Sequence, residues 1–317
     1  MSKIVPLAAA SPRRSQVPSL AASVRRTVRR PQFWCGALIL VPTFAWYVAF
    51  SYFPIARGLW LAVVDYDFLT RANRGFVGLE NFRQLFLNPL LFIALRNTAV
   101  LAAVQFVFMI PLGLLLATCL VNVRRWMHIY QAAIFLPVVM SLVAISLLFR
   151  FLMDPDVGIF NSLLSAVGLP TSKWLSSPDT ALLTLAGIDV WKGLGFTTVL
   201  LTAGMLNISS ELYDAARVDG VNEWQRFRYM TLPLLAHTLV LVMVLYAISS
   251  LQVYTSVYIM TSGGPGTATY VLNLLIVQEA FNNFRFGAAA AAACIQLAVI
   301  FVITVIQLRL ISPKWSY

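Results

Sequence analysis

Charged residues are scarce in this chain. Asp, Glu, Lys and Arg make up 11% of its 317 residues, whereas 60% of the residues are hydrophobic. Soluble domains carry about 25% charged residues, so this composition excludes a soluble enzyme of this size and a disordered protein. The net charge of +11 lies on a chain whose composition favours lipid as its solvent. We therefore expect a membrane protein that contacts lipid and binds no nucleic acid.

Cysteine is rare as well, and the usual catalytic motifs are absent from the sequence. Cys35, Cys119 and Cys294 lie far apart in apolar runs, so we interpret them as small hydrophobic residues rather than disulfides or metal ligands. The sequence contains no Gly-x-x-x-x-Gly-Lys-Ser/Thr phosphate loop. His128 and His237 stand beside no serine or metal motif. We expect no catalytic residue, no metal and no cofactor bound by this chain, and hence no enzyme.

The few charges divide the apolar sequence into segments that can cross a bilayer, for which about 20 apolar helical residues are needed. The sequence predicts an all-α membrane protein with six transmembrane helices. They lie at about residues 33–56, 97–121, 130–152, 181–206, 236–260 and 287–309. Together they form one domain, residues 33–310. A basic tail (1–32), expected to be disordered, precedes this domain, and a short tail (311–317) follows it.

Lys and Arg are unevenly distributed between the connections. With the N-terminus inside, the cytoplasmic parts hold 14 of these residues and the external parts hold eight. Cytoplasmic loops carry the excess of positive charge in membrane proteins, so we predict that both termini are cytoplasmic. We interpret the tail, with three pairs of adjacent arginines, as a positive anchor that contacts anionic lipid.

One cytoplasmic connection, residues 208–233, is long and holds four of the twelve acids. Ser210 is a suitable N-cap, Gly220 suits a left-handed helix end, and Asn222 with Gln225 forms a capping box. The pattern predicts a helix, a glycine turn and a second helix that leads into the membrane. Such a segment either docks in a groove of another protein or lies on the lipid headgroups.

The spacing within this connection is specific. Asp-Ala-Ala at 214–216 is followed after three residues by Gly220 and, after nine more, by Met-Thr-Leu-Pro at 230–233. This resembles the EAA loop of binding-protein-dependent ABC importer permeases, whose pattern is Glu-Ala-Ala, three residues, Gly, nine residues, Ile, any residue, Leu-Pro. Asp214 and Met230 depart from it but keep the charge and the apolar character.

The resemblance implies an ABC type I importer permease fold in a bacterial cytoplasmic (inner) membrane. It implies that residues 208–233, which we call the coupling loop, dock on an ATPase subunit. The residues concerned are Glu211, Tyr213, Asp214, Ala215, Ala216, Asp219, Gly220 and Pro233. ATP and Mg would bind to two separate ATPase subunits. The other implied partners are a second permease subunit and an external sugar-binding protein.

Other stretches resemble the carbohydrate-uptake branch of this family, the maltose and glycerol-phosphate type, and its first permease of a pair. They include Phe-Val-Gly-Leu-Glu-Asn-Phe at 76–82 and Ser-Gly-Gly-Pro-Gly at 262–266. The implied substrate is a sugar or a related polyol. Permeases for amino acids, phosphate or peptides are the alternatives within the family. Outside it, the alternative is an ion-coupled secondary transporter, which should show more buried acids.

Polar residues inside the predicted helices are candidates for a translocation path. Asp189 and Lys192 lie one turn apart in the fourth helix, so we expect them to neutralise each other; they form either a structural ion pair or part of the path. The fifth helix has a polar stretch that suits sugar binding or hydrogen bonding between helices. Its candidates are Ser250, Gln252, Tyr254, Thr255 and Tyr258. The family often has Phe-Asp where this chain has Tyr254-Thr255.

Overall fold

The computed structural model describes residues 31–67, 72–123 and 125–311. The predicted basic tail lies almost wholly outside these residues, and so does most of the C-terminal tail. The first elements are α2 (Pro31–Tyr47), the π-helix η1 (Val48–Tyr52), α3 (Phe53–Leu61), β1 (Val64–Asp67), β2 (Ala72–Phe76), α4 (Glu80–Leu87), α5 (Pro89–Asn122), α6 (Met127–Val139), α7 (Leu142–Leu152), α8 (Ile159–Ala166) and the 3-10 helix η2 (Trp174–Ser176).

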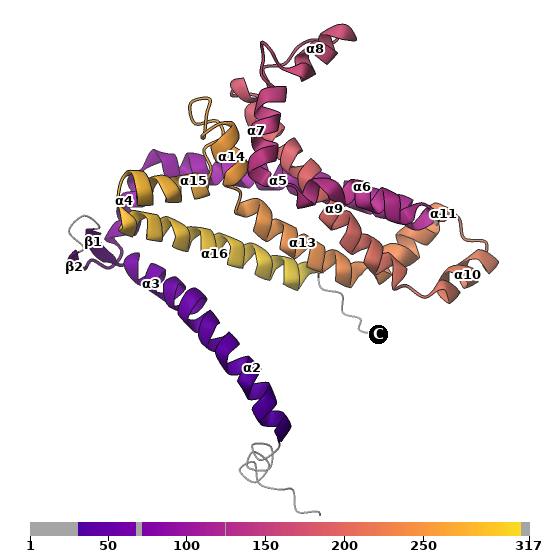
Figure 1. Ribbon diagram of the computed structural model, residues 1–317, viewed down its shortest axis with the longest axis horizontal. Coiled ribbons are helices and arrows are strands. Elements are labelled where there is room, and N and C mark those ends of the chain that lie inside the picture. The colour runs from indigo at the N-terminus through magenta and orange to yellow at the C-terminus, as the bar shows by residue number, and fades with distance from the viewer. Residues whose placement is uncertain (1–30, 68–71, 124, 312–317) are drawn as a thin grey trace, which may run out of the picture. The chain divides into compact units, whose positions relative to one another are not determined.

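The second half begins with the long helix α9 and ends with α16, another long helix (Figure 1). Its elements are α9 (Ala181–Leu206), α10 (Ser210–Val218), α11 (Glu223–Arg226), the π-helix η3 (Phe227–Thr231), α12 (Leu232–Leu234), α13 (Ala236–Leu251), α14 (Thr255–Met260), α15 (Leu272–Val277), the π-helix η4 (Gln278–Asn282) and α16 (Phe286–Ile311).

Membrane-length helices dominate the chain. Four helical segments are long and apolar enough to cross a membrane: Leu38–Leu61, Pro89–Asn122, Ala236–Met260 and Phe286–Arg309. Two pairs of helices, α6 with α7 and α9 with α10, pass the same test together, although they are bent by 90° and 70°. Counting each pair as one span gives up to six, and each of the six overlaps one of the predicted spans.

The chain divides into two compact units, one up to Gly58 and one from Leu59 onward. In the first unit, α2 and η1 follow one another without a break and lead into α3. None of its described side chains is buried. Such exposure suits a span whose apolar side chains meet lipid or another chain.

The third predicted span, 130–152, is not one straight helix. It breaks at Met140 and Ser141, where the backbone is not helical and Met140 is extended, and Figure 1 shows α7 turning away from α6 at this point. Pro137 lies one turn before the break, where its ring and missing N–H weaken the helical hydrogen-bond ladder. The prediction of a continuous helix was therefore wrong here.

The fifth predicted span, 236–260, is also interrupted. α13 ends at Leu251 and α14 begins at Thr255, so the polar stretch lies at a helix break rather than within a helix. The second span, in contrast, starts eight residues earlier than predicted. Asn88 accepts a hydrogen bond from the Leu90 N–H and Pro89 occupies the first turn, so the helix begins there.

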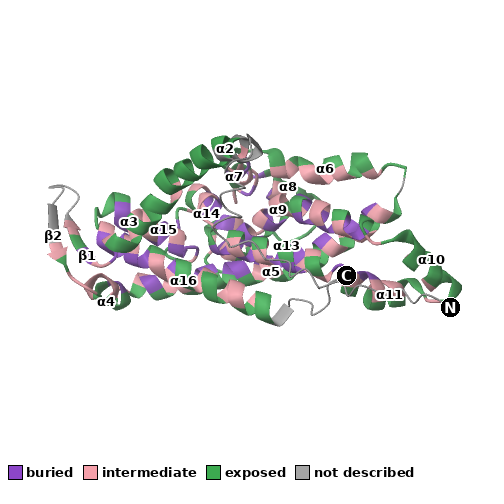
Figure 2. Ribbon diagram, turned by 90° about the horizontal axis from the view of Figure 1, so that it is seen from below, coloured by how far each residue is buried: buried purple, intermediate pink, exposed green. Residues whose placement is uncertain are grey.

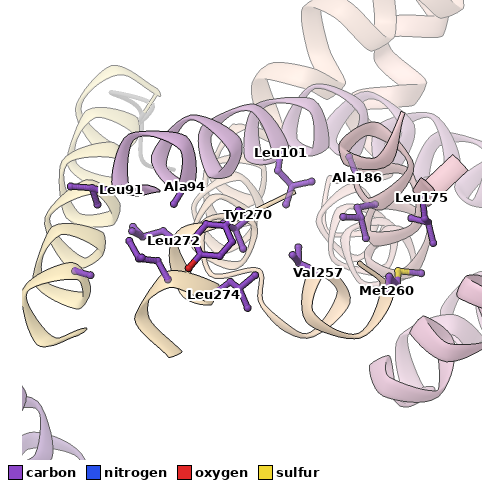
Figure 3. Packing of buried hydrophobic residues seen from close by; sticks show 14 of the residues in the cluster. Leu91, Ala94, Leu101, Leu175, Ala186, Val257, Met260, Tyr270, Leu272 and Leu274 are labelled. Carbon is purple, nitrogen blue, oxygen red and sulfur yellow. The ribbon is translucent and has the colours of Figure 1, made fainter. Parts of the chain in front are cut away.

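Part of the core of the second unit forms where α5 meets α15 and the segment before it. Leu91, Ala94 and Leu101 of α5 face Tyr270, Leu272 and Leu274 (Figure 3). A smaller cluster, nearer the coupling loop, joins α5, α9 and α13 through residues such as Ala117, Leu201 and Met243. α5 thus lies in both clusters.

A small antiparallel hairpin lies between α3 and α4, and the all-α prediction omitted it. β1 pairs with β2, with Val64 opposite Phe76. The Asn81 amide of α4 donates hydrogen bonds of 3.0 Å to the carbonyls of Ala62 and Val64. A side chain with two donors therefore ties this hairpin to α4.

Gly195 permits the close approach of α6 to α9. A Cβ atom there would lie 2.4 Å from the Ile134 carbonyl oxygen and 2.9 Å from the Phe135 Cα, both backbone atoms. We expect Gly195→Ala to push the two helices apart and to lower the free energy of unfolding by about 1–3 kcal/mol. Thermal unfolding of the purified chain in detergent measures this change.

Gly187 on the same helix is the matched control, because a Cβ there meets nothing within 4 Å. Gly187→Ala should leave the packing intact and stabilise the helix by about 0.5–1 kcal/mol. Equal unfolding temperatures for the two variants would contradict the assigned packing.

Candidate functional site: the coupling loop and the polar centre

The coupling loop begins with α10. Its N-cap is Ser209 and not Ser210 as predicted: the Ser209 Oγ accepts a hydrogen bond of 3.3 Å from the Glu211 N–H. The helix ends as the sequence predicts, with Gly220 at φ +72°. The N–H of Gly220 donates to the Arg217 carbonyl, and the N–H of Val221 donates to that of Ala216. These two bonds form the Schellman motif that closes a helix.

The second helix of the loop is shorter than the first and leads into the membrane. Asn222 and Gln225 form the predicted capping box at the start of α11. The π-helix η3 follows directly, then α12, and Leu235 alone separates α12 from α13. The chain from Glu223 to α13 is therefore one nearly continuous helical path into a membrane span.

Most of the loop's predicted docking residues are exposed. Figure 2 shows α10 largely in the colour of exposed residues. Exposed among the predicted residues are Glu211, Asp214, Ala215, Asp219, Gly220 and Pro233. Tyr213 and Ala216 are half-buried and face back toward the rest of the loop. Of the eight residues predicted to dock, six are therefore exposed, and two, Tyr213 and Ala216, are not.

In the membrane part, Asp189 of α9 joins three helices. Its Oδ2 accepts a hydrogen bond of 2.9 Å from the Gln105 Nε2 of α5 and one of 3.1 Å from the Ser256 Oγ of α14. At 1.5 Å per residue, Asp189 lies about 12 Å along α9 from its start. Buried carboxylates need such donors, because water is absent at this depth.

The expected ion pair between Asp189 and Lys192 does not form, although both residues are described. Instead, the Lys192 Nζ donates a hydrogen bond of 3.2 Å to the Val138 carbonyl. Val138 is the penultimate residue of α6, where the helix break leaves carbonyls without partners. Lys192 therefore caps the broken helix, with its charge at the negative end of the helix dipole.

The polar stretch of the fifth span divides between two surroundings. Ser250 is buried, donates to the Ala247 carbonyl and lines an apolar cavity of about 380 Å³ between α5, α13 and α16. Gln252 is exposed at the break and Thr255 is half-buried. The rings of Tyr254 and Tyr258 stack with centroids 5.3 Å apart. Only Ser256 from this stretch bonds to Asp189.

Two polar residues of α5 are not among the predicted candidates. The Gln105 amide holds Asp189. Asn97 was not singled out, but its Nδ2 donates to the carbonyls of Thr267 and Tyr270, at 2.9 and 3.1 Å. It thereby holds the loop after α14 against α5. The only available signal was a polar residue inside an apolar run.

The segment after α7 is held by one amide. Asn161 donates to the carbonyls of Pro155 and Ser172, and its Oδ1 accepts from the Trp174 indole at 2.8 Å. Nearby, the N–H groups of Val157 and Asp156 donate to the Asp154 carboxylate and lower its pKa. Within the described residues, no cluster of three or more His, Cys, Asp or Glu side chains could hold a metal ion.

The chain matches a known family over more than half of its length. Residues 109–317 match the family described as binding-protein-dependent transport system inner membrane component. The chain belongs to this family. It is therefore a multi-pass inner-membrane permease of a binding-protein-dependent ABC importer, a transport component rather than a catalytic one.

Several curated permeases are similar over nearly their whole length. A probable ABC transporter permease of Bacillus subtilis, YurN, is 33% identical over 86% of this chain and 94% of its own. The lactose transport system permease LacF of Rhizobium radiobacter is 31% identical, over 91% and 97%. The trehalose/maltose permease MalF of Thermococcus litoralis is 28% identical, over 86% and 92%.

A solved structure confirms the permease fold. The crystal structure of a bacterial ABC transporter that imports the acidic polysaccharide alginate contains a chain with a TM-score of 0.79 and 25% identity. The match covers 92% of this permease and 97% of that chain. A second structure of an alginate transporter, with a TM-score of 0.77, includes a periplasmic protein bound to alginate pentasaccharide.

The Asp189 contacts predict unequal effects of two substitutions. Asp189→Asn keeps an acceptor oxygen for Gln105 and Ser256, so the fold should remain stable. Asp189→Leu leaves both donors without a partner, and each unsatisfied group costs about 1–3 kcal/mol. We expect Leu to lower the unfolding temperature well below that of the Asn variant. The same unfolding temperature for both would mean that these hydrogen bonds do not stabilise the fold.

Proposed function

We propose that this permease translocates a sugar or a related polyol delivered by an external substrate-binding protein. Support comes from its relatives, which include permeases named for lactose and for trehalose/maltose, and from its similarity to a permease chain of an alginate importer. The aromatic pair Tyr254 and Tyr258, stacked at the helix break, provides the kind of ring surface on which sugars bind.

The exposed coupling loop is the part of the permease that, in this proposal, receives the movement of the ATPase subunits. α10 has a fixed start and a fixed end, and its exposed side chains are the small or acidic Ser210, Glu211, Asp214 and Ala215 together with Leu212, Arg217 and Val218. A firm helix with small exposed residues suits a groove of another protein. The sequence has no phosphate loop. ATP and Mg would therefore bind to two separate ATPase subunits, whose closure moves α10.

The proposed assembly contains a second permease subunit beside this one, two ATPases and the external binding protein. Both termini of this chain would be cytoplasmic. The first span, whose described side chains are not buried within the chain, leaves apolar surface that a second permease or lipid would cover. The path for the solute would run past the two helix breaks and the Asp189 centre, with Lys192, Gln252, Tyr254, Thr255 and Tyr258 near it.

The solute class can be tested on the binding protein encoded beside this permease. We expect the purified binding protein to bind mono-, di- or oligosaccharides, or polyols, in calorimetric titrations. A panel with amino acids, phosphate and short peptides serves as the control. Tight binding to one of these control solutes, with no response to any carbohydrate, would overturn the substrate assignment.

Gly220→Pro tests the coupling loop. Proline cannot adopt φ +72° and has no N–H for the Arg217 carbonyl, so α10 should lose its closure. We expect the variant to insert into the membrane at normal levels but to lose co-purification with the ATPase encoded nearby. Ala216→Glu, which puts a charge on the half-buried side of α10, should have the same effect.

Gly168→Pro is the matched control, because Gly168 ends α8 with φ +74° and the same pair of hydrogen bonds. In the proposed topology it lies on the external side, so its substitution should leave ATPase attachment intact. If Gly168→Pro abolished attachment and Gly220→Pro did not, the coupling assignment would be wrong.

A further inference from the structure

Tyr213 lies in the coupling loop but does not belong to its exposed surface. Of the nine residues of α10, all of them described, only Tyr213 and Ala216 are partly buried. On the far side, Val218 is 88% exposed. Tyr213 is therefore the one long side chain through which α10 reaches back to the rest of the loop.

The hydroxyl of Tyr213 shares a hydrogen bond of 3.2 Å with the hydroxyl of Thr231. Thr231 is 6% exposed and is the last residue of the π-helix η3. Its carbonyl accepts a hydrogen bond from the N–H of Leu235, the residue before α13. The bond thus joins α10 directly to the cytoplasmic start of a membrane span, across 18 residues of sequence.

Arg226 reinforces this connection. Its guanidinium carbon lies 5.6 Å from the centre of the Tyr213 ring, within the range of a cation–π contact. An ion pair with Glu223 fixes the guanidinium, whose side chain is mostly buried. Tyr213 is thus held at its hydroxyl by η3 and on its ring face by α11.

Other routes from α10 to the start of α13 are weaker, although α10 is also joined to α9 through residues 207–209. The backbone between α10 and α11 passes through the left-handed turn at Gly220, where a Cβ would meet nothing within 4 Å. A cavity of about 1260 Å³ is lined by α5 on one side and by α10, α11 and η3 on the other. Neither the turn nor the cavity gives α10 a firm contact with the start of α13, so a side chain is needed to pass a displacement of α10 on to it.

The start of α13 is in turn fixed to α9. A Cβ at Gly204, in the last turn of α9, would lie 2.7 Å from both the Leu235 Cδ1 and the Thr238 Oγ1. The two helices are therefore in direct contact where the coupling loop leaves one and enters the other. Whatever moves Thr231 moves this junction.

We propose that Tyr213 and Thr231 are a positioning pair, clamped by Arg226, that makes α10 and the start of α13 move as one body. The inference rests on the proposed coupling function and deepens it. Tyr213 then acts inside the permease instead of contacting the ATPase. A variant that lacks the pair still binds the ATPase, but the movement of α10 no longer reaches the start of α13.

The test uses the whole importer complex in nanodiscs, with spin labels on this chain. Cysteines replace the exposed residues Val218 of α10 and Leu241 of α13, and the native Cys35, Cys119 and Cys294 are changed to alanine. The distance between the labels is measured without nucleotide and after trapping with ATP and vanadate. ATP and vanadate are the only probes, so the solute need not be known.

With Tyr213 and Thr231 intact, we expect one narrow distance distribution that is the same in both states. Tyr213→Phe and Thr231→Val each remove one side of the hydrogen bond. Either should raise the population with α10 detached about five-fold, the factor by which one net hydrogen bond shifts an equilibrium. The detached population appears as a second distance after trapping. The double variant should have the same detached population as either single variant, because the two changes remove the same hydrogen bond.

Two matched controls remove the same atoms elsewhere at the cytoplasmic ends of helices. Tyr130→Phe affects an exposed tyrosine of α6, and Thr118→Val a half-buried threonine of α5 that donates to its own helix at Leu114. Neither should change the label distance. Additive effects of Tyr213→Phe and Thr231→Val, or unchanged distributions in both, would overturn the pair.

Co-purification separates this inference from the proposed function. If the ATPase leaves with Gly220→Pro and stays with Tyr213→Phe, docking and transmission are distinct, as proposed. If Tyr213→Phe also releases the ATPase, Tyr213 is a docking residue and the pair is refuted, while the coupling loop stands. If the intact chain binds no ATPase, the coupling function fails, and the inference fails with it.

Discussion

Water is absent from the interior of a bilayer, so every polar group there needs a partner from the protein itself. This constraint organises the membrane part of the permease. The Asp189 carboxylate receives an amide from α5 and a hydroxyl from α14, and the Lys192 ammonium reaches a free carbonyl of α6. These two charged side chains, three residues apart, thereby connect α9 to three other helices. An ion pair between them would have connected α9 to none.

The same constraint explains why the helix breaks are tolerable. A broken helix exposes carbonyls that would be costly in lipid. At the break between α6 and α7, Lys192 satisfies one of them, and Gly195 lets α9 lie directly against the α6 backbone. At the break after α13, the Gln296 amide of α16 donates to the Leu251 carbonyl. Side chains from unbroken helices thus complete the interrupted ones.

The sequence was sufficient for features that depend on local chemistry. Long apolar runs with few charges indicated the spans, of which the structure has up to six, and Gly220 with the Asn222–Gln225 box indicated both helices of the coupling loop. The sequence was insufficient where the hydrogen-bond partner of a side chain lies far away in the chain. Nothing near Lys192 in the sequence indicates the Val138 carbonyl, 54 residues away, and Gln105 lies 84 residues from Asp189. The ion-pair prediction failed because neighbours in sequence compete with tertiary partners.

Continuity distinguishes α9 from the two interrupted spans that it contacts. α9 runs unbroken from Ala181 to Leu206, touching α6 at Gly195, the start of α13 at Gly204 and α14 through Asp189. α13, which receives the coupling loop, is separated from α14 by the break at 252–254. A displacement that enters through Thr231 can therefore move α13 against α14 without breaking a helical ladder. Because α9 contacts both α13 and α14, the hydrogen bond between Ser256 and Asp189 ties the part of the span beyond the break to the same helix that holds the start of α13.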